Sequence, residues 1–115
     1  MFTLNWSDTA RENYDDLKAA AQASLVARKR KKRGKSTPAE GLFKQVHKTI
    51  ELLAANPKHP GLQTHVYRAF ANPVDPQDKV FEAYAQNNTP GAYRVFWCYG
   101  PGQKVITIIA ITSHP

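Results

Sequence analysis

The sequence has a single cysteine and no long hydrophobic run. These two features argue against disulfides, cysteine-rich metal sites and membrane-spanning helices. Cys98 is the single cysteine among 115 residues, so the chain can form neither an internal disulfide nor a cysteine-rich metal site. The longest apolar run is far shorter than the roughly 20 residues that a membrane helix needs, and residues 1–16 lack the features of a signal peptide. The sequence therefore predicts a cytoplasmic protein without membrane contact, in which Cys98 is a small structural hydrophobe.

Motifs for small-molecule chemistry are also missing. The chain has no glycine-rich phosphate loop, no nucleophile elbow and no metal-ligand motif, which argues against a small-molecule enzyme. His59 and His65 flank the turn at Pro60-Gly61, but no cysteine or pair of acids lies near them, so no metal site is predicted there. We expect neither a cofactor nor a metal.

Acidic residues are absent from the stretch that holds much of the positive charge. The net charge is +7, and residues 28–35 contain seven of the sixteen basic residues, while the rest of the chain is formally neutral. One interpretation is a solvated connector, because like charges at this density repel one another. The other is a contribution to RNA binding through phosphate contacts. The candidate RNA-binding residues are Arg28, Lys29, Arg30, Lys31, Lys32, Arg33 and Lys35.

The first half of the chain has the pattern of one strand and two helices. Residues 2–6 alternate apolar and polar side chains, which predicts a short strand. Ser7 and Asp8 then begin an amphipathic helix that we expect to end at about residue 27. A basic connector follows at about 28–36, and a second helix begins at the capping box of Thr37 and Glu40 and ends at Asn56-Pro57.

The second half is rich in β-branched and aromatic residues. LQTHVYRAF, residues 62–70, predicts a strand with His65 and Tyr67 on one face, and three further β-rich runs lie between residues 80 and 115. VITIIAI, residues 105–111, is apolar or β-branched throughout, which is typical of a central strand. The predicted fold is a single α+β domain, residues 1–115, of order β-α-α-β-β-β-β. Two antiparallel helices pack on one face of a small twisted, mostly antiparallel sheet whose other face is comparatively open.

A single cation interrupts the apolar run from Tyr93 to Tyr99. Strand alternation places Arg94 on one face with Phe96 and Cys98, and Val95 and Trp97 on the other. An unpaired buried guanidinium is costly, so Arg94 either meets a carboxylate or stands on an open face that receives an anion from outside.

The element order, together with AYRVFW and a terminal strand ending in TSHP, resembles the RelE/ParE superfamily of bacterial toxins from type II toxin-antitoxin pairs. HPGLQTH and FEAYAQNNTPGAYRVFW are similar to a widespread subgroup whose members are known as candidate toxins or translational repressors. The resemblance implies an antitoxin partner. It also implies one of two activities, which are mRNA cleavage, on the ribosome in some members, and inhibition of DNA gyrase.

Carried over by position, the resemblance implies that Arg94 contacts the scissile phosphate and that His114 is a catalytic histidine near the C-terminus. RelE-like enzymes have lysines on the preceding strand, but here that stretch is Phe81-Glu82-Ala83-Tyr84. Metal-independent cleavage needs a base, a cation and an acid, and Glu82, Arg94 and His114 are the candidates in that order. The alternatives are a cross-strand ion pair of Glu82 with Arg94, and a non-enzymatic protein that inhibits gyrase or only binds RNA.

Overall fold

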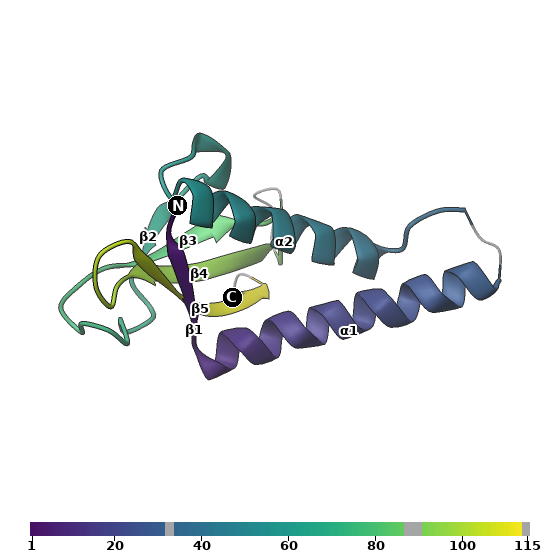
Figure 1. Ribbon diagram of the computed structural model, residues 1–115, viewed down its shortest axis with the longest axis horizontal. Helices are drawn as coiled ribbons and strands as arrows, with labels where there is room; N and C mark the ends of the chain where they lie inside the picture. The colour runs from purple at the N-terminus through teal and green to yellow at the C-terminus, as the bar shows by residue number, and fades with distance from the viewer. Residues whose placement is uncertain (32–33, 87–90, 114–115) are drawn as a thin grey trace.

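The computed structural model describes residues 1–31, 34–86 and 91–113, and its element order confirms the predicted β-α-α-β-β-β-β arrangement (Figure 1). None of the helices within these residues has the length and apolar composition needed to cross a membrane. The elements are β1 Thr3–Trp6, α1 Asp8–Arg30, α2 Pro38–Ala55, a 3-10 turn at Pro60–Leu62, β2 His65–Tyr67, β3 Val80–Tyr84, β4 Tyr93–Tyr99 and β5 Val105–Ser113.

Both helices begin at the residues that the sequence indicates. The Ser7 side chain accepts a hydrogen bond from the Ala10 amide at 3.0 Å, which caps α1, and its hydroxyl donates to the Ile109 carbonyl at 2.6 Å. Thr37 and Glu40 form the predicted capping box of α2. However, α1 continues to Arg30, three residues beyond the expected end, so the helix includes the first part of the basic run.

The five strands form one sheet in the order β1-β5-β4-β3-β2. β1 runs parallel to β5, and the other neighbours are antiparallel, so β5 has a strand on each side, as predicted. The two helices pack on one face, where each fully buried aliphatic or aromatic side chain contributes about 1.5–3 kcal/mol to folding. The buried side chains of this core include Val46, Ile50, Leu53, Val95, Trp97, Ile106 and Ile108.

β2 is shorter than the strand expected over residues 62–70. Pro60 to Leu62 form a 3-10 turn, and Gln63 adopts a left-handed backbone conformation with φ 48° and ψ 44°. A left-handed residue interrupts an extended chain, so pairing with β3 begins only at His65. The predicted alternation survives in the three residues that remain, because His65 lies opposite Glu82 and Tyr67 lies opposite Val80.

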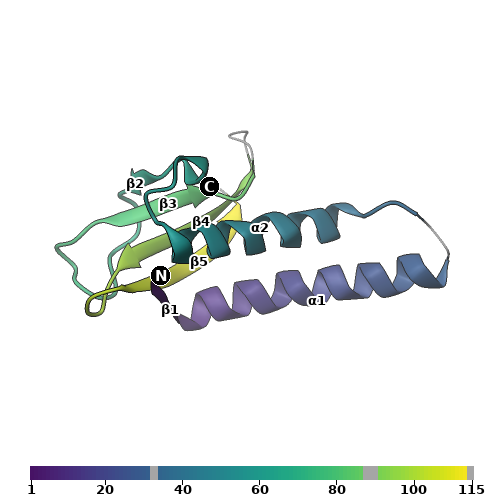
Figure 2. The same ribbon diagram turned by 45° about the horizontal axis from the view of Figure 1, so that its top comes forward.

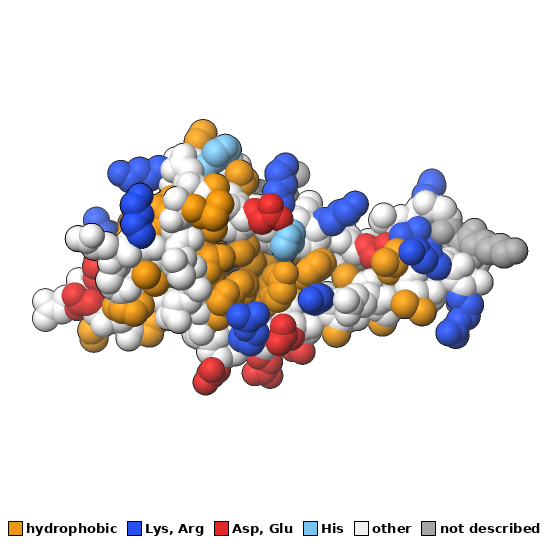
Figure 3. All heavy atoms as spheres, viewed as in Figure 1, with side chains coloured by type: hydrophobic (Ala, Val, Ile, Leu, Met, Phe, Trp, Pro, Cys, Tyr) orange, Lys and Arg blue, Asp and Glu red, His pale blue; other side chains and the backbone are white. Residues whose placement is uncertain are grey.

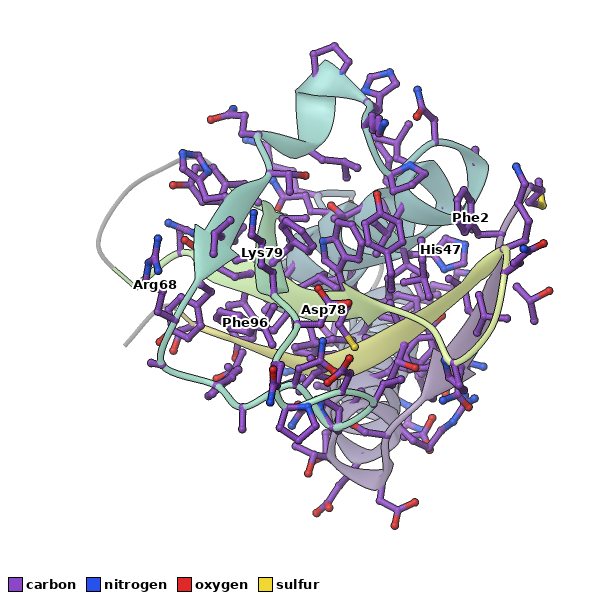
Figure 4. The ribbon with its side chains drawn as sticks, turned by 90° about the vertical axis from the view of Figure 1, so that its left-hand side faces the viewer. Phe2, His47, Arg68, Asp78, Lys79 and Phe96 are labelled. Atoms are coloured by element: carbon purple, nitrogen blue, oxygen red, sulfur yellow. The ribbon has the colours of Figure 1, made fainter. Side chains whose placement is uncertain are left out.

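The face opposite the helices is more covered than the sequence suggests. The loop of residues 68–79 runs along it, and Phe70 packs edge-on against Phe96 with ring centroids 4.8 Å apart. Figure 4 views the molecule from the side on which this loop lies. Phe96 and Cys98 are fully buried, and burial together with the nearby charge of Asp78 raises the pKa of the Cys98 thiol to about 11. The expectation that Cys98 is a buried hydrophobe agrees with this environment.

The helix hairpin gives the molecule its elongated shape, with principal extents of 51 × 26 × 22 Å. α1 and α2 lie side by side and project beyond the sheet, as Figure 2 shows from a second direction. The described basic residues between the helices therefore lie at the far end of the hairpin from the strands.

Candidate functional site

Four side chains from β2, β3 and β4 lie on the sheet face opposite the helices. In the register of the sheet, His65 pairs with Glu82 and Tyr84 pairs with Arg94. Residues directly opposite each other share a face, and alternate residues along β3 share one too. These positions alternate with residues of the helix-side core such as Ala83 and Val95. We call His65, Glu82, Tyr84 and Arg94 the strand-face cluster.

Arg94 lies on the predicted face, but the expectation that it is open to an outside anion is wrong for this conformation. The residue is only 2% exposed. Its Nη1 donates hydrogen bonds to the carbonyls of Ala92 at 3.0 Å and Tyr93 at 3.4 Å. Its guanidinium carbon lies 3.9 Å from the centroid of the Tyr84 ring, a cation–π contact of about 0.5–2 kcal/mol. Groups within the protein therefore stabilise the buried charge.

Glu82 is the carboxylate beside this arginine. It is 7% exposed, and its Oε2 lies 4.0 Å from Arg94 Nε. In the register of the sheet the two residues share a face but are diagonal neighbours, since Arg94 is opposite Tyr84 and Glu82 is opposite Phe96. The ion pair foreseen as the alternative to catalysis is therefore present at the outer limit of such contacts.

His65 and Tyr84 are the members of the cluster that the sequence did not single out as a site. Their rings stack with centroids 5.3 Å apart and an interplanar angle of 16°. His65 is exposed, and its Nδ1 contacts the carbonyl oxygen of Gln63. Alternation along residues 63–67 already placed His65 on one face, but the pairing of that face with Glu82 depends on the sheet register. Across residues 1–31, 34–86 and 91–113, no three His, Cys, Asp or Glu side chains are grouped to hold a metal ion.

His114 lies outside the described residues, so its predicted role as a catalytic histidine is not tested. The nearest described neighbour on β5 is Thr112, which pairs with Arg94. A bulge in the pairing of β4 with β5 places Ile108 opposite Trp97 and Ala110 opposite Phe96. Ile108 and Ala110 therefore lie on opposite faces of the sheet, although they are two positions apart in the sequence.

In the basic run of residues 28–35, one described cation packs between the helices and the other described cations are exposed. Arg28 Nη2 lies 2.7 Å from Glu40 Oε1, and the Arg28 side chain is only 18% exposed. Hydrogen bonds from Arg28, and more weakly from Thr37, lower the pKa of Glu40 to about 2. Arg28 is therefore part of the helix packing and not of an exposed connector, which corrects the expectation. Lys32 and Arg33 lie outside the described residues.

The remaining described cations of the run are exposed at the end of the hairpin. Lys29 and Arg30 end α1, and Lys31 and Lys35 follow it. We call these four residues the hairpin-end cations. Figure 3 shows Lys and Arg side chains at this end of the molecule as well as elsewhere on the same face. The hairpin-end cations and the strand-face cluster are therefore two separate surfaces.

The sequence matches no protein-family model and no curated protein. The fold, in contrast, is similar to solved toxin structures over nearly the whole length of both chains. A YoeB/ParE toxin from Agrobacterium tumefaciens superimposes with a TM-score of 0.62 at 9% identity, covering 98% of this chain and 99% of that chain.

Two toxin–antitoxin structures are similar in the same way. The heterotetrameric YoeB-YefM toxin-antitoxin complex from Staphylococcus aureus gives a TM-score of 0.58 at 9% identity, covering 100% of this chain and 99% of that chain. The chromosomal ParDE toxin-antitoxin system from P. aeruginosa gives 0.52 at 16% identity, covering 100% and 98%. At these identities the likeness concerns the fold: the chain has the fold of the YoeB/ParE toxins.

Proposed function

We propose that this protein is the toxin of a type II toxin-antitoxin pair and cleaves mRNA, free or bound to the ribosome, without a metal. The observation that carries the proposal is the strand-face cluster: an arginine, a carboxylate, a tyrosine and a histidine gathered on the helix-free face of a toxin fold. Cleavage by the 2′-hydroxyl needs a cation for the phosphate and groups that move protons. Side chains of these types are what such chemistry uses.

Within the proposal, Arg94 stabilises the charge that develops on the phosphate, and His114 donates a proton to the leaving oxygen. The sequence makes Glu82 the candidate base, but its burial beside Arg94 suits a different role. A carboxylate 4.0 Å from the guanidinium holds that group on the sheet face. We therefore propose Glu82 as a positioning residue that acts through Arg94. Because Arg94 is buried, RNA binding must rearrange its surroundings before phosphate and guanidinium meet.

The same burial favours a second candidate, a non-enzymatic protein that inhibits its target by contact alone. If Arg94 remains enclosed by Glu82, Tyr84 and backbone carbonyls, it serves folding and no chemistry occurs on this face. The resemblance to the RelE/ParE superfamily makes DNA gyrase the target to test, and RNA bound without cleavage is the other form of this candidate. For either function we propose an antitoxin partner, as in the YoeB-YefM complex.

Growth arrest tests the role of Arg94. Induced expression of the wild type should arrest growth and deplete intact message, whereas Arg94→Ala should relieve the arrest. Arg68→Ala, which removes an exposed arginine from the loop after β2, is the matched control and should arrest growth like the wild type. Since Arg94→Ala leaves Glu82 buried without its cation, Arg94→Lys serves as a second variant that keeps a charge there.

The outcome separates the two candidates. Loss of arrest in both Arg94 variants, with circular dichroism of folded protein, supports the nuclease. Arrest that persists in a folded Arg94→Lys variant, together with loss of supercoiling by purified gyrase, supports the ParE-like alternative.

A further inference from the structure

We infer that His65 is the general base of the strand-face cluster, the group that removes the proton from the attacking 2′-hydroxyl. The inference rests on the proposed nuclease function and adds to it a residue for which the sequence predicts a strand position but no catalytic role. It comes from three features of the structure: the exposure of His65, the contact that fixes its ring, and its neighbours on β3 and β4.

Exposure separates His65 from the other candidates. Glu82 and Arg94 are both buried, so neither side chain is open to a hydroxyl from solvent in this conformation. His65 is exposed on the edge strand of the sheet, directly opposite Glu82. A base must come within hydrogen-bond reach of the proton that it takes. Within the described cluster, His65 is the proton-accepting side chain that meets this condition without rearrangement.

The Gln63 carbonyl determines which ring nitrogen can act. A carbonyl oxygen only accepts hydrogen bonds, so its contact with Nδ1 of His65 requires a proton on Nδ1. In the neutral ring the lone pair that can accept a proton then lies on Nε2. Within the described part of the chain, no hydrogen bond engages Nε2. The ring therefore has the tautomer and the free nitrogen of a general base.

The backbone that supplies this carbonyl is itself unusual. Gln63 has φ 48° and ψ 44°, a left-handed conformation that costs a residue with a side chain about 1–2 kcal/mol. The conformation follows the 3-10 turn and precedes β2 by one residue, where it directs the chain into the sheet. Unfavourable backbone conformations of this kind cluster at functional sites. The contact with His65 gives this one a role.

The groups that face His65 link it to the cation of the site. Tyr84 of β3 stacks on its ring, Arg94 of β4 lies over the Tyr84 ring, and Glu82 of β3 is its partner across the sheet. β3 lies between β2 and β4, so the base and the cation stand on either side of the strand that carries Tyr84. A scissile phosphate near Tyr84 has its proton acceptor on one side and its positive charge on the other.

The cleavage step moves one proton to the base and returns one from the acid. The 2′-hydroxyl proton moves to Nε2 of His65 while the 2′-oxygen forms a bond to phosphorus. The bond from phosphorus to the 5′-oxygen breaks, and its electron pair stays on that oxygen. The 5′-oxygen takes a proton from the acid, proposed above as His114. The products are a 2′,3′-cyclic phosphate and a 5′-hydroxyl end.

His65→Asn tests the inference, because the asparagine amide can still donate to the Gln63 carbonyl but cannot accept a proton as an imidazole does. We expect cleavage to fall by about 10²- to 10⁴-fold. Affinity for a 2′-deoxy RNA analogue, which cannot be cleaved, and the melting temperature should change little. His47→Asn, an exposed histidine on α2, is the matched control and should cleave like the wild type.

The outcomes are distinguishable. A wild type that cuts no RNA overturns both the proposed function and this inference. A His65→Asn variant that cuts within about threefold of the wild type, against the expected loss of at least about 10²-fold, overturns this inference alone. An NMR spectrum that correlates ring nitrogens and protons should show the neutral His65 ring protonated at Nδ1, and protonation at Nε2 instead would also overturn it.

Discussion

Arg28 and Glu40 show how one ion pair connects the basic run to the helix packing. The Glu40 carboxylate accepts hydrogen bonds from the backbone amide and the hydroxyl of Thr37, which belong to the α2 cap, and from the Arg28 guanidinium on α1. The Glu40 side chain therefore caps the N-terminus of α2 and also links α2 to α1 near the far end of the hairpin. Removing it affects both contacts at once.

The lowered pKa of Glu40 makes this contribution dependent on pH. Its folded pKa of about 2 lies below the ordinary value of 4.5, so the stabilisation is complete above about pH 4.5 and is lost as the pH falls towards 2. We expect Glu40→Gln to lower the melting temperature at pH 7, and the difference from the wild type to shrink between pH 5 and pH 2. Thermal unfolding monitored by circular dichroism over this range measures it.

Glu12→Gln, at an exposed position of α1, is the control for this experiment and should follow the wild type at every pH. A Glu40→Gln deficit that stays constant from pH 7 to pH 2 would contradict the assignment.

At the residue scale, alternation predicted the face of Arg94 but not its environment. The register places Arg94 and Phe96 on the same face, opposite Tyr84 and Glu82, as strand alternation predicts. The loop of residues 68–79 packs on Phe96 through Phe70, and Arg94 contacts Glu82, Tyr84 and the backbone carbonyls of Ala92 and Tyr93. A loop with two prolines gives no periodic signal, so its path over the sheet could not be predicted. The stack of His65 on Tyr84 likewise depends on a register that spans a long loop.

At the scale of elements, the signals that predicted correctly were local ones. The cap of α2 and its end before Asn56-Pro57 follow from a few adjacent residues, and both are confirmed. The errors concern features that depend on distant contacts. The left-handed Gln63 determines where β2 starts. The bulge in β5 is defined by the shift in its register with β4. The residue types and their spacing around Gln63 and in β5 are those of regular strands, so the sequence indicates neither the late start of β2 nor the bulge.

We predict that the exposed cations between the helices contribute to RNA affinity and not to stability. Replacing the hairpin-end cations Lys29, Arg30, Lys31 and Lys35 with glutamine should weaken RNA binding and reduce its salt dependence. For single-stranded RNA the slope of log affinity against log salt should fall by about 0.7 for each phosphate that the variant no longer neutralises. The melting temperature should change little, because these side chains are exposed. Fluorescence anisotropy over a salt series measures the slope.

Arg28→Gln provides the contrast. This variant should lower the melting temperature, since it breaks the pair with Glu40, while its effect on the salt slope stays small. A large loss of stability in the fourfold variant would show that the connector is structural.

At the scale of the whole molecule, the strand-face cluster and the hairpin-end cations lie apart along a body 51 Å long (Figure 1). The strand-face cluster is on the sheet, and the hairpin-end cations are where the helices project beyond it. An RNA that contacts both must extend along the long axis. We expect the cations to supply affinity without sequence preference, and the sheet face to supply the chemistry.

The most direct test of the central claim is cleavage by the purified protein of ribosome-bound message, and of free message in the presence of a metal chelator, with the ends of the products characterised. The proposed function predicts discrete cuts that end in a 2′,3′-cyclic phosphate and a 5′-hydroxyl, and that persist when free divalent ions are removed from the free message. Message that stays intact in both forms, at protein concentrations that saturate RNA binding, would contradict it.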